Sequence, residues 1–387
     1  MEADCDMDPG IWSNLPEELM DRVLAALPLL AFLQLRSVCK QWCSLIHSSH
    51  FCQLRQHSGV SHKPCFLFHV SVGSTGHLLI YDPALGKWGK QTLSFLPPGI
   101  SASLVSVSGG LLCFKASKSD SACYLVCNPI TKAYKELPPP LRYRSTFRSP
   151  SLQIMLVDEA SNSHKIILAG YSTGRDSATE VYDSLTNSWR LVGDLPLKDD
   201  SKVTSIHPYS GQPICNGNIY CRSHLPPGVV SYSLEEESWT DLRVPICQSI
   251  LSPYLVEYNG SILMVGGVRR QGRKELNPES FCIWELSMKD LQWIELARMP
   301  DSTCKLFLQK NIFAKFRATG QSGMIYFTSA SVTSSVVVYD LSLRSWIWLP
   351  DCNLKIGRRF LTTFSPPLAW DRVFVYEPFL ESMDIKV

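Results

Sequence analysis

The first fifty residues carry a helical pattern of apolar positions. Leucine and valine side chains recur every four residues at Leu15, Leu19, Val23 and Leu27. This spacing predicts a helix with one broad apolar face, and Pro28 ends it. Two further apolar runs, at 29–35 and 38–46, predict two more short helices. Since so small a unit cannot bury this much apolar surface within itself, we expect the surplus to contact another protein or the chain's own second domain.

From Cys65 onward the chain changes to short β-prone runs separated by Gly, Pro, Asn and Ser, a pattern typical of an all-β fold. One unit recurs, in which an apolar strand ending in Tyr-Asp or a variant is followed by a polar turn and an aromatic residue. The aromatic residues of successive units are Trp88, Tyr134, Trp189, Trp239, Trp293 and Trp346. They lie about 50 residues apart, which is the period of kelch repeats.

Repeats of this length predict a β-propeller, because a single four-stranded blade cannot bury its faces alone and radial stacking of blades does so. We expect the Tyr-to-Trp segment to join the third and fourth strands of each blade. The recurring aromatic residues should then pack in the seams between blades rather than contact a ligand. Six units can be counted, and β-prone runs at 360–364 and 372–376 follow them. At least one of these runs should pair with the first blade and close the ring, and the number of blades is six or seven.

The N-terminal pattern also contains a family motif. The Leu15-Pro16 pair, the Leu27-Pro28 pair and a Val38-Cys39-Lys40-x-Trp42 element follow one another in order. Together they resemble an F-box. The resemblance implies that this segment docks on the Skp-type adaptor of a cullin-based ubiquitin ligase. The contact or fold-defining positions that it implies are Leu15, Pro16, Leu19, Val23, Leu27, Pro28, Leu35, Val38 and Trp42.

The repeats contain part of a kelch signature, since the diglycine Gly266-Gly267 follows an apolar strand. Head and repeats together resemble the plant-type F-box/kelch-repeat family, and are similar within it to the Unusual Floral Organs and Hawaiian Skirt group. The resemblance implies an α+β multidomain chain with a small three-helix F-box head and an all-β kelch-type propeller. The expected division is an acidic flexible tail at 1–10, the F-box at 11–51, a linker at 52–64 and a substrate-binding propeller at 65–387.

Charge and cysteine content limit the expected binding partners and cellular compartment of the protein. A net charge of +2 with 19% charged residues gives no global attraction to nucleic acid or membrane, so direct nucleic-acid contact is possible but not indicated. The acidic N-terminus lacks the apolar core of a signal peptide, and no apolar run is long enough to cross a bilayer. The 14 cysteines are therefore expected to be free thiols in an intracellular protein of the nucleus, the cytoplasm or both.

A metal site is also disfavoured. Cys39, Cys43 and His47 are spaced so that they could share one side of a helix. However, no fourth ligand lies at finger-like spacing, and free cysteines usually pack as small buried hydrophobes. We expect no metal and no cofactor.

Basic residues gather in two classes of loop that should share one face of the propeller. With strands counted outward from the centre, the turns between second and third strands lie on the same face as the connections between blades. The candidate residues in these loops are Arg142, Tyr143, Arg144, Arg148, Arg175, Arg269, Arg270, Arg273, Lys274, Arg358 and Arg359. Arginine suits carboxylate and phosphate groups, so this face could bind an acidic or phosphorylated protein substrate. The alternative is that these are ordinary solvated loop charges.

Three functional classes follow. The first is a substrate receptor of a Skp–cullin–F-box ubiquitin ligase, which recruits a target for ubiquitylation and degradation while other subunits catalyse. The second is a non-degradative F-box scaffold or transcriptional cofactor. The third is an oxidase of the kind found on some kelch propellers, but its copper centre needs convergent His and Tyr ligands. Beyond the first blade only His164, His207 and His224 are present, without paired spacing, so we expect a non-catalytic protein.

Overall fold

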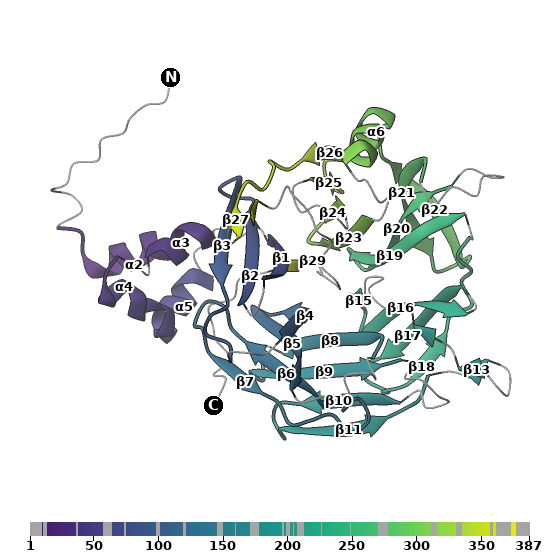
Figure 1. Ribbon diagram of the computed structural model, residues 1–387, viewed down its shortest axis with the longest axis horizontal. Helices are drawn as coiled ribbons and strands as arrows, with labels where there is room; N and C mark the ends of the chain where they lie inside the picture. Colours follow the sequence, from purple (N-terminus) through teal and green to yellow (C-terminus); the bar gives the residue numbers. More distant parts are fainter. Residues whose placement is uncertain are drawn as a thin grey trace.

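The computed structural model shows a ring of six antiparallel sheets, five with four strands and one with five, and a helical head beside the ring (Figure 1). It describes residues 10, 14–35, 38–56, 64–72, 75–97, 101–118, 121–144, 150–158, 160–170, 178–195, 197–198, 202–203, 205–206, 213–225, 227–247, 249–269, 278–310, 316–329, 335–356, 359–360 and 373–376. The expected β-propeller is therefore present, and it has six blades rather than seven. The kelch class of these blades stays a prediction.

Each blade is an antiparallel sheet whose strands run from the centre of the ring outward. Blade 1 contains β29 (Val373–Tyr376), β1 (Cys65–Val72), β2 (Thr75–Asp82) and β3 (Lys87–Thr92). Blade 2 contains β4 (Ser101–Ser108), β5 (Leu111–Lys118), β6 (Ser121–Cys127) and β7 (Tyr134–Glu136). Blade 3 contains β8 (Leu152–Asp158), β9 (Ser163–Ala169), β10 (Thr179–Asp183) and β11 (Ser188–Val192).

The remaining blades repeat this order. Blade 4 contains β14 (Ser205–Ile206), β15 (Ile214–Cys215), β16 (Asn218–Leu225), β17 (Gly228–Ser233) and β18 (Trp239–Asp241). Blade 5 contains β19 (Ile250–Tyr258), β20 (Ser261–Val268), β21 (Ser280–Ser287) and β22 (Gln292–Arg298). Blade 6 contains β23 (Phe316–Gln321), β24 (Met324–Ser329), β25 (Val336–Asp340) and β26 (Ser345–Trp348).

The C-terminal strand closes the ring. β29 pairs antiparallel with β1, with Cys65 opposite Tyr376 and Phe68 opposite Val373, so the last described strand is the inner strand of the first blade. This confirms the prediction that one of the two C-terminal β-prone runs pairs with blade 1. Part of the other run forms β28 (Arg359–Phe360), which pairs with β27 (Lys355–Ile356) in a small separate hairpin.

The core consists of the seams between blades, because alternate side chains of each strand point to opposite faces of its sheet. In β1, for example, Leu67 packs with blade 2, whereas Phe66 and Phe68 pack with blade 6. The described buried apolar residues form six clusters of this kind, one at each seam. Each blade thus buries both faces only because it has two neighbours, which is the physical reason for the ring.

The recurring Tyr-to-Trp segments are the hairpins between third and fourth strands, as predicted. Tyr81 lies opposite Trp88, Tyr182 opposite Trp189, Tyr232 opposite Trp239 and Tyr339 opposite Trp346 in the strand register. The two rings of each pair are also in contact, with centroids 4.7 to 5.3 Å apart.

Several of these tryptophans also bind the neighbouring blade through their ring N–H. Trp88 Nε1 donates to the Pro350 carbonyl of blade 6 at 2.7 Å, and Trp189 Nε1 donates to the Pro138 carbonyl of blade 2 at 2.7 Å. Trp239 Nε1 donates to Thr179 Oγ1 of blade 3 at 2.9 Å. The recurring aromatic residues therefore connect successive blades, as expected for structural residues.

The head contains the helices α2 (Glu17–Ala25), α3 (Leu29–Leu35), α4 (Lys40–Ser44) and α5 (Ser49–Gln56), with a 3-10 helix η1 (Leu45–His47) after α4. The first two predicted helices correspond to α2 and α3, and the third to α4 together with η1. Helix α5 was not predicted. It extends the helical head five residues past the expected border at residue 51.

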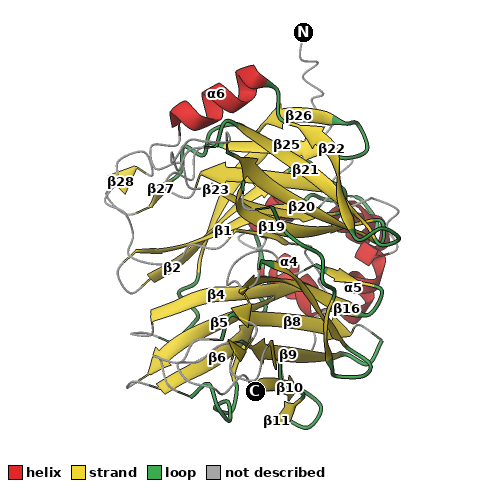
Figure 2. Ribbon diagram, turned by 90° about the vertical axis from the view of Figure 1, so that its right-hand side faces the viewer, coloured by secondary structure: helices red, strands yellow, loops and turns green. Residues whose placement is uncertain are grey.

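Outside the blades, α6 (Asp301–Lys310) lies in the connection between blades 5 and 6, and β12 (Leu197–Lys198) pairs with β13 (Lys202–Val203). Figure 2 shows α6 outside the strands of these blades. Its Phe307 is fully buried against Phe281, with ring centroids 5.3 Å apart. Among the described residues, no helix has the length and apolar character needed to span a membrane.

Candidate functional site

The head is packed against the propeller at the seam between blades 1 and 2. Its buried residues Leu24, Leu29, Phe32 and Phe51 belong to the same core cluster as Leu67 and Ile80 of blade 1 and Leu112 and Phe114 of blade 2. Phe32 and Phe51 are at most 1% exposed, and their rings stack with centroids 5.6 Å apart. One face of the head is therefore continuous with the propeller core.

Polar contacts fix the orientation of the head. Asp82, which ends β2, is 2% exposed, and its Oδ2 accepts the backbone N–H of Leu30 at 3.1 Å. Its Oδ1 accepts the N–H of Ala84 at 3.0 Å, the turn contact typical of an aspartate in this position. The first-turn amides of a helix have no partner within the helix. Asp82 of the Tyr-Asp element of blade 1 supplies such a partner for one amide of α3.

Arg55 supplies hydrogen bonds to backbone carbonyls at the C-terminal end of α2. The side chain is 4% exposed, and its Nη1 donates to the carbonyls of Ala25 at 3.1 Å and Leu27 at 2.9 Å. Its guanidinium also lies 5.0 Å from the centroid of the Phe32 ring. These contacts satisfy carbonyls at the C-terminal end of α2, where a positive charge is favourable.

A groove of about 760 Å³ separates the head from the outer strand of blade 1. Leu30, Leu33, Lys87 and Trp88 are among its lining residues. Beside the groove, α3 and β3 are in close contact. A Cβ atom added at Gly89 of β3 would lie 2.5 Å from Leu30 Cδ2 of α3. A larger residue at 89 would therefore require the Leu30 side chain to move.

The opposite face of the head is apolar and exposed. Leu19 and Val23, one helical turn apart on α2, are 46% and 40% exposed, and Val38 before α4 is 61% exposed. Gln41 Nε2 donates to Glu17 Oε1 at 3.1 Å, which holds the start of α4 beside the start of α2. We call Leu19, Val23 and Val38 the outer strip of the head.

The residues expected to contact an adaptor fall into two groups. Pro16, Leu19, Val23 and Val38 are exposed, whereas Leu15, Leu27, Pro28, Leu35 and Trp42 are half-buried. Of the half-buried group, Leu27, Leu35 and Trp42 pack against the core cluster that the head shares with the propeller. These three side chains thus take part in packing within the chain. Their predicted role in adaptor contact stays a prediction.

The strand order agrees with the expected common face of the basic loops. The loop after β20 joins second and third strands, and the segment after β7 joins blades 2 and 3, so both leave the ring on one side. Arg142 and Arg144 are exposed and Arg269 is half-buried. Arg359 lies in β28, without a described side chain, and Arg148, Arg175, Arg270, Arg273, Lys274 and Arg358 lie outside the described residues.

Tyr143 does not belong to an exposed face. It is 1% exposed, and its hydroxyl lies 2.6 Å from the Gly170 carbonyl and 2.7 Å from the Ala178 carbonyl. The buried carboxylate of Glu180 accepts the backbone N–H groups of Leu141, Arg142 and Tyr143 and so holds this segment against blade 3. The expectation that Tyr143 contacts a substrate is corrected, because its ring is part of the core.

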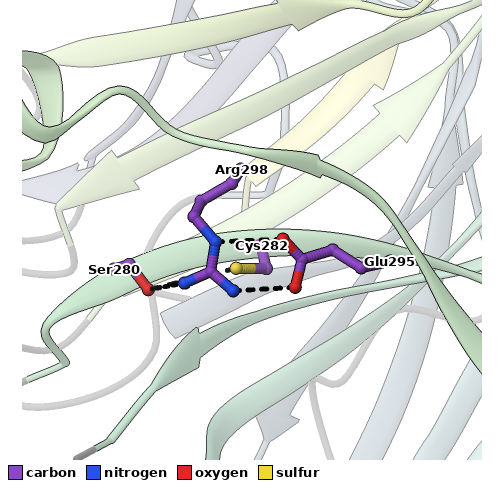
Figure 3. A network of polar contacts seen from close by, with 4 residues as sticks. All are labelled: Ser280, Cys282, Glu295 and Arg298. Carbon is purple, nitrogen blue, oxygen red and sulfur yellow. Dashed lines mark hydrogen bonds and ion pairs between the residues drawn. The ribbon is translucent and has the colours of Figure 1, made fainter.

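Some arginines of the propeller are neutralised within the chain. At the outer edge of blade 5, Arg298 Nε and Nη2 donate to the two carboxylate oxygens of Glu295 at 2.9 and 2.7 Å (Figure 3). Arg298 Nη1 donates to Ser280 Oγ at 2.9 Å, beside Cys282. Arg190 pairs with Glu237 in the same two-pronged way. Each of these arginines is thus paired with a carboxylate of the chain itself.

Two family models match the chain. The F-box domain model matches residues 12–54, and the KIB1-4 beta-propeller model matches residues 82–340, which is more than half of the chain. The chain is an F-box protein of the KIB1-4 β-propeller family.

Curated plant proteins resemble this F-box protein over most of their length. Protein ABERRANT PANICLE ORGANIZATION 1 of Oryza sativa subsp. japonica is 30% identical, over 96% of this chain and 90% of the relative. Protein UNUSUAL FLORAL ORGANS of Arabidopsis thaliana is 27% identical over 89% and 80%. SKP1-interacting partner 15 of Arabidopsis thaliana is 26% identical over 87% and 91%. The resemblance noted in the sequence to the group of Unusual Floral Organs is thereby confirmed.

Several residues that shape this F-box protein were not found from the sequence. In the sequence, Asp82 is recognisable only as the end of a Tyr-Asp element, and Arg55 falls within the expected linker at 52–64. The signal for Arg55 was present, since Phe51, Leu54 and Arg55 continue a helical spacing. Among the described residues, no three His, Cys, Asp or Glu side chains gather so that they could hold a metal ion.

Proposed function

We propose that this F-box protein is the substrate receptor of a Skp–cullin–F-box ubiquitin ligase. The outer strip of the head docks on a Skp-type adaptor and, through it, on a cullin. The propeller presents a bound target protein for ubiquitylation and degradation, and the chemistry is done by other subunits. The contribution of this F-box protein is to hold the target close to the reacting groups.

The observation that carries this proposal is the exposure of Leu19, Val23 and Val38. The propeller also exposes leucines, such as Leu185 and Leu343, but these lie in hairpin turns of different blades. Leu19 and Val23 lie on one helix face, and amphipathic helices commonly use such i, i+4 pairs to dock in a partner groove. An exposed apolar surface that the chain itself does not cover marks an interaction site.

The fixed attachment of the head supports the receptor role. The shared core cluster, the Asp82 contact and the Arg55 contacts all join the head to blade 1 or stabilise its helices. A target held by the propeller would therefore keep a defined distance and direction from the adaptor. Such a geometry favours transfer of ubiquitin to particular target lysines.

Relatives support the adaptor half of the proposal. The name of SKP1-interacting partner 15 states that this relative interacts with SKP1, and the alignment covers 87% of the present chain. The F-box model matches residues 12–54, which include the outer strip. We infer the same class of adaptor for this chain.

The target would bind the face of the ring that the basic loops share. Arg142, Arg144 and Arg269 belong to this face among the described residues, and arginine forms two-pronged hydrogen bonds with carboxylate or phosphate. The proposed target segment is therefore acidic or phosphorylated.

The adaptor contact can be tested with the double variant Leu19→Ala/Val23→Ala. Removing two central apolar contacts should weaken binding of a purified Skp-type adaptor by about 100-fold or more, since hot-spot side chains contribute about 2 kcal/mol or more each. Isothermal titration with the full chain measures the affinity. The thermal midpoint should stay within about 1 °C, because both side chains are largely exposed.

A matched control is the double variant Leu185→Ala/Leu343→Ala. These leucines are 69% and 71% exposed on the propeller, so two exposed apolar side chains are again truncated to alanine, but away from the head. Adaptor affinity should be unchanged. Equal adaptor affinity for wild type and the Leu19/Val23 variant would contradict the proposal.

A further inference from the structure

The groove between the head and blade 1 follows the whole outer strand of that blade. Every residue of β3 (Lys87–Thr92) lines it, and so do Leu30 and Leu33 of α3, the helix beside β3 in Figure 1. Successive side chains of a strand point to opposite faces of its sheet, so a groove lined by six consecutive residues runs along the edge of the strand. β3 is the outermost strand of its sheet, and such an edge can accept a further strand.

Among its described lining residues the groove has positive charges and no negative ones. The charges belong to Lys87 and Lys90 of β3 and to Lys132, in the turn before β7 of blade 2. All three lysines are exposed. The buried carboxylate of Asp82 lies beside Leu30, but it already accepts two backbone N–H groups. With 37 basic and 35 acidic residues in the whole chain, these three lysines are a local excess of positive charge.

The groove also has an apolar lining. Leu30, Leu33, Leu85 and Trp88 contribute to it, and Leu85 is 38% exposed. A segment that fits this groove should therefore be extended, should carry carboxylates for the lysines, and should carry apolar side chains for the leucines and the tryptophan.

The first nine residues of the chain have this pattern. Their sequence is MEADCDMDP, with no Lys or Arg. The odd positions up to residue 7 hold Met, Ala, Cys and Met. The even positions hold the carboxylates Glu2, Asp4, Asp6 and Asp8. In an extended backbone, this alternation places a row of carboxylates on one side and a row of apolar side chains on the other.

Residues 1–9 are attached to the head within reach of the groove. They precede Gly10, whose carbonyl accepts from the side chain of Asn14 just before α2. Gln41 of α4 is hydrogen-bonded to the start of α2, and Cys43 of the same short helix lines the groove. Nine extended residues span about 30 Å, more than the roughly 20 Å width of two packed helices. The length of the segment is therefore sufficient.

We propose that residues 1–9 dock in this groove as an extended segment along the outer edge of β3. The carboxylates pair with Lys87, Lys90 and Lys132, and the apolar row packs against the leucines and Trp88. Addition of a strand to a sheet edge is a common mode of peptide binding. The docked segment contacts both α3 and blade 1, so it forms a further connection between head and propeller. This inference does not rest on the proposed adaptor contact, because no residue of the outer strip is among the described lining residues.

Zero-length cross-linking of the full chain tests the position of the segment. A carbodiimide joins carboxylates to lysine amines that are in contact, and peptide mapping by mass spectrometry identifies the joined pairs. Residues 2–8 should cross-link to Lys87, Lys90 or Lys132 about fivefold more often than to Lys289. Lys289 is a matched control, since it is an exposed lysine in the turn between β21 and β22 of blade 5. Sodium chloride at about 0.5 M should reduce the difference, because salt screens exposed charges.

Amide hydrogen exchange tests the pairing with β3. A neutral variant carries Glu2→Gln, Asp4→Asn, Asp6→Asn and Asp8→Asn. Amides of residues 87–92 should exchange about fivefold faster in this variant than in the wild type, because the edge of β3 loses its cover. Lys132→Gln, which lies outside the measured segment, should accelerate exchange there by about twofold. The control Lys289→Gln should leave it unchanged.

The two measurements decide the proposal together. It is overturned if cross-links to the three groove lysines are no more frequent than those to Lys289. It is also overturned if residues 87–92 exchange equally fast in the wild type and the neutral variant. Cross-links between chains of normal and heavy isotope composition would assign the groove to the segment of a second copy and exclude docking within one chain. The neutral variant should bind the adaptor as the wild type does, so loss of this docking and failure of the adaptor proposal are distinguishable.

Discussion

The blades and the head use their apolar side chains in different ways. Every blade buries apolar residues on both faces of its sheet, against the blade before it and the blade after it. Helix α2 buries Leu24 and Ala25 on one side and leaves Leu19 and Val23 exposed on the other. A closed ring leaves no blade without a neighbour, whereas the head has a neighbour on one side only.

This difference bears on the two possible uses of the apolar surface of the head that the sequence left open. The apolar surplus of the head was expected to contact either another protein or the chain's own second domain. Phe32, Phe51 and Leu29 take the second option, because they pack with blades 1 and 2. The outer strip has no such cover in the described part of the chain, and it is the surface that the proposed adaptor would bury.

The largest expected effect comes from breaking the inner face of the head. Phe32→Ala should lower the free energy of unfolding by about 3–5 kcal/mol, since the ring is fully buried and stacks on Phe51. Leu19→Ala on the outer strip should cost less than about 0.5 kcal/mol. Urea denaturation followed by tryptophan fluorescence measures both. Similar costs for the two variants would show that the head is not anchored as described.

A smaller effect distinguishes one seam from another. The ring N–H of Trp189 donates to the Pro138 carbonyl of the preceding blade, but Trp293 Nε1 is buried without a described partner. Trp189→Phe should therefore cost about 1–2 kcal/mol more than Trp293→Phe, because only the first removes a hydrogen bond and leaves a carbonyl unpaired. Thermal unfolding of the two variants tests this. Equal losses would mean that ring volume, rather than the N–H contact, stabilises these seams.

The repeated parts of the molecule could be predicted from the sequence, because the same local physics recurs there. The position of Trp88 opposite Tyr81 and the closure of blade 1 by residues 373–376 both follow from strand spacing and from the cost of an open edge. The sequence pattern also identified Leu19 and Val23 as members of an apolar helix face.

The contacts that occur once were not predictable in the same way. Asp82 looks like the aspartate of any repeat, and only the fold brings α3 to its second oxygen. Tyr143 is surrounded by arginines in the sequence, which suggested an exposed loop, yet Glu180 draws that segment inward.

The smallest expected effect concerns the hairpin turns that all blades share. In each turn the residue two positions before the recurring aromatic has positive φ, for example Gly86 at 61° and Leu291 at 52°. Glycine adopts this conformation freely, whereas leucine pays about 1–2 kcal/mol for it. Glycine also increases the conformational entropy of the unfolded chain, which offsets part of this gain. Leu291→Gly should therefore raise the free energy of unfolding by a net amount of about 0.5–1 kcal/mol.

The reverse change supplies the control for this last prediction. Gly86→Ala adds a Cβ atom where nothing lies within 4 Å, so it tests backbone conformation without a clash. It should lower stability by about 1 kcal/mol. Both variants are measured by urea denaturation under the same conditions. A loss of stability in Leu291→Gly would mean that the side chain of Leu291, which is 38% exposed, contributes more by packing than its backbone costs, and that the turns of blades 1 and 5 are not equivalent.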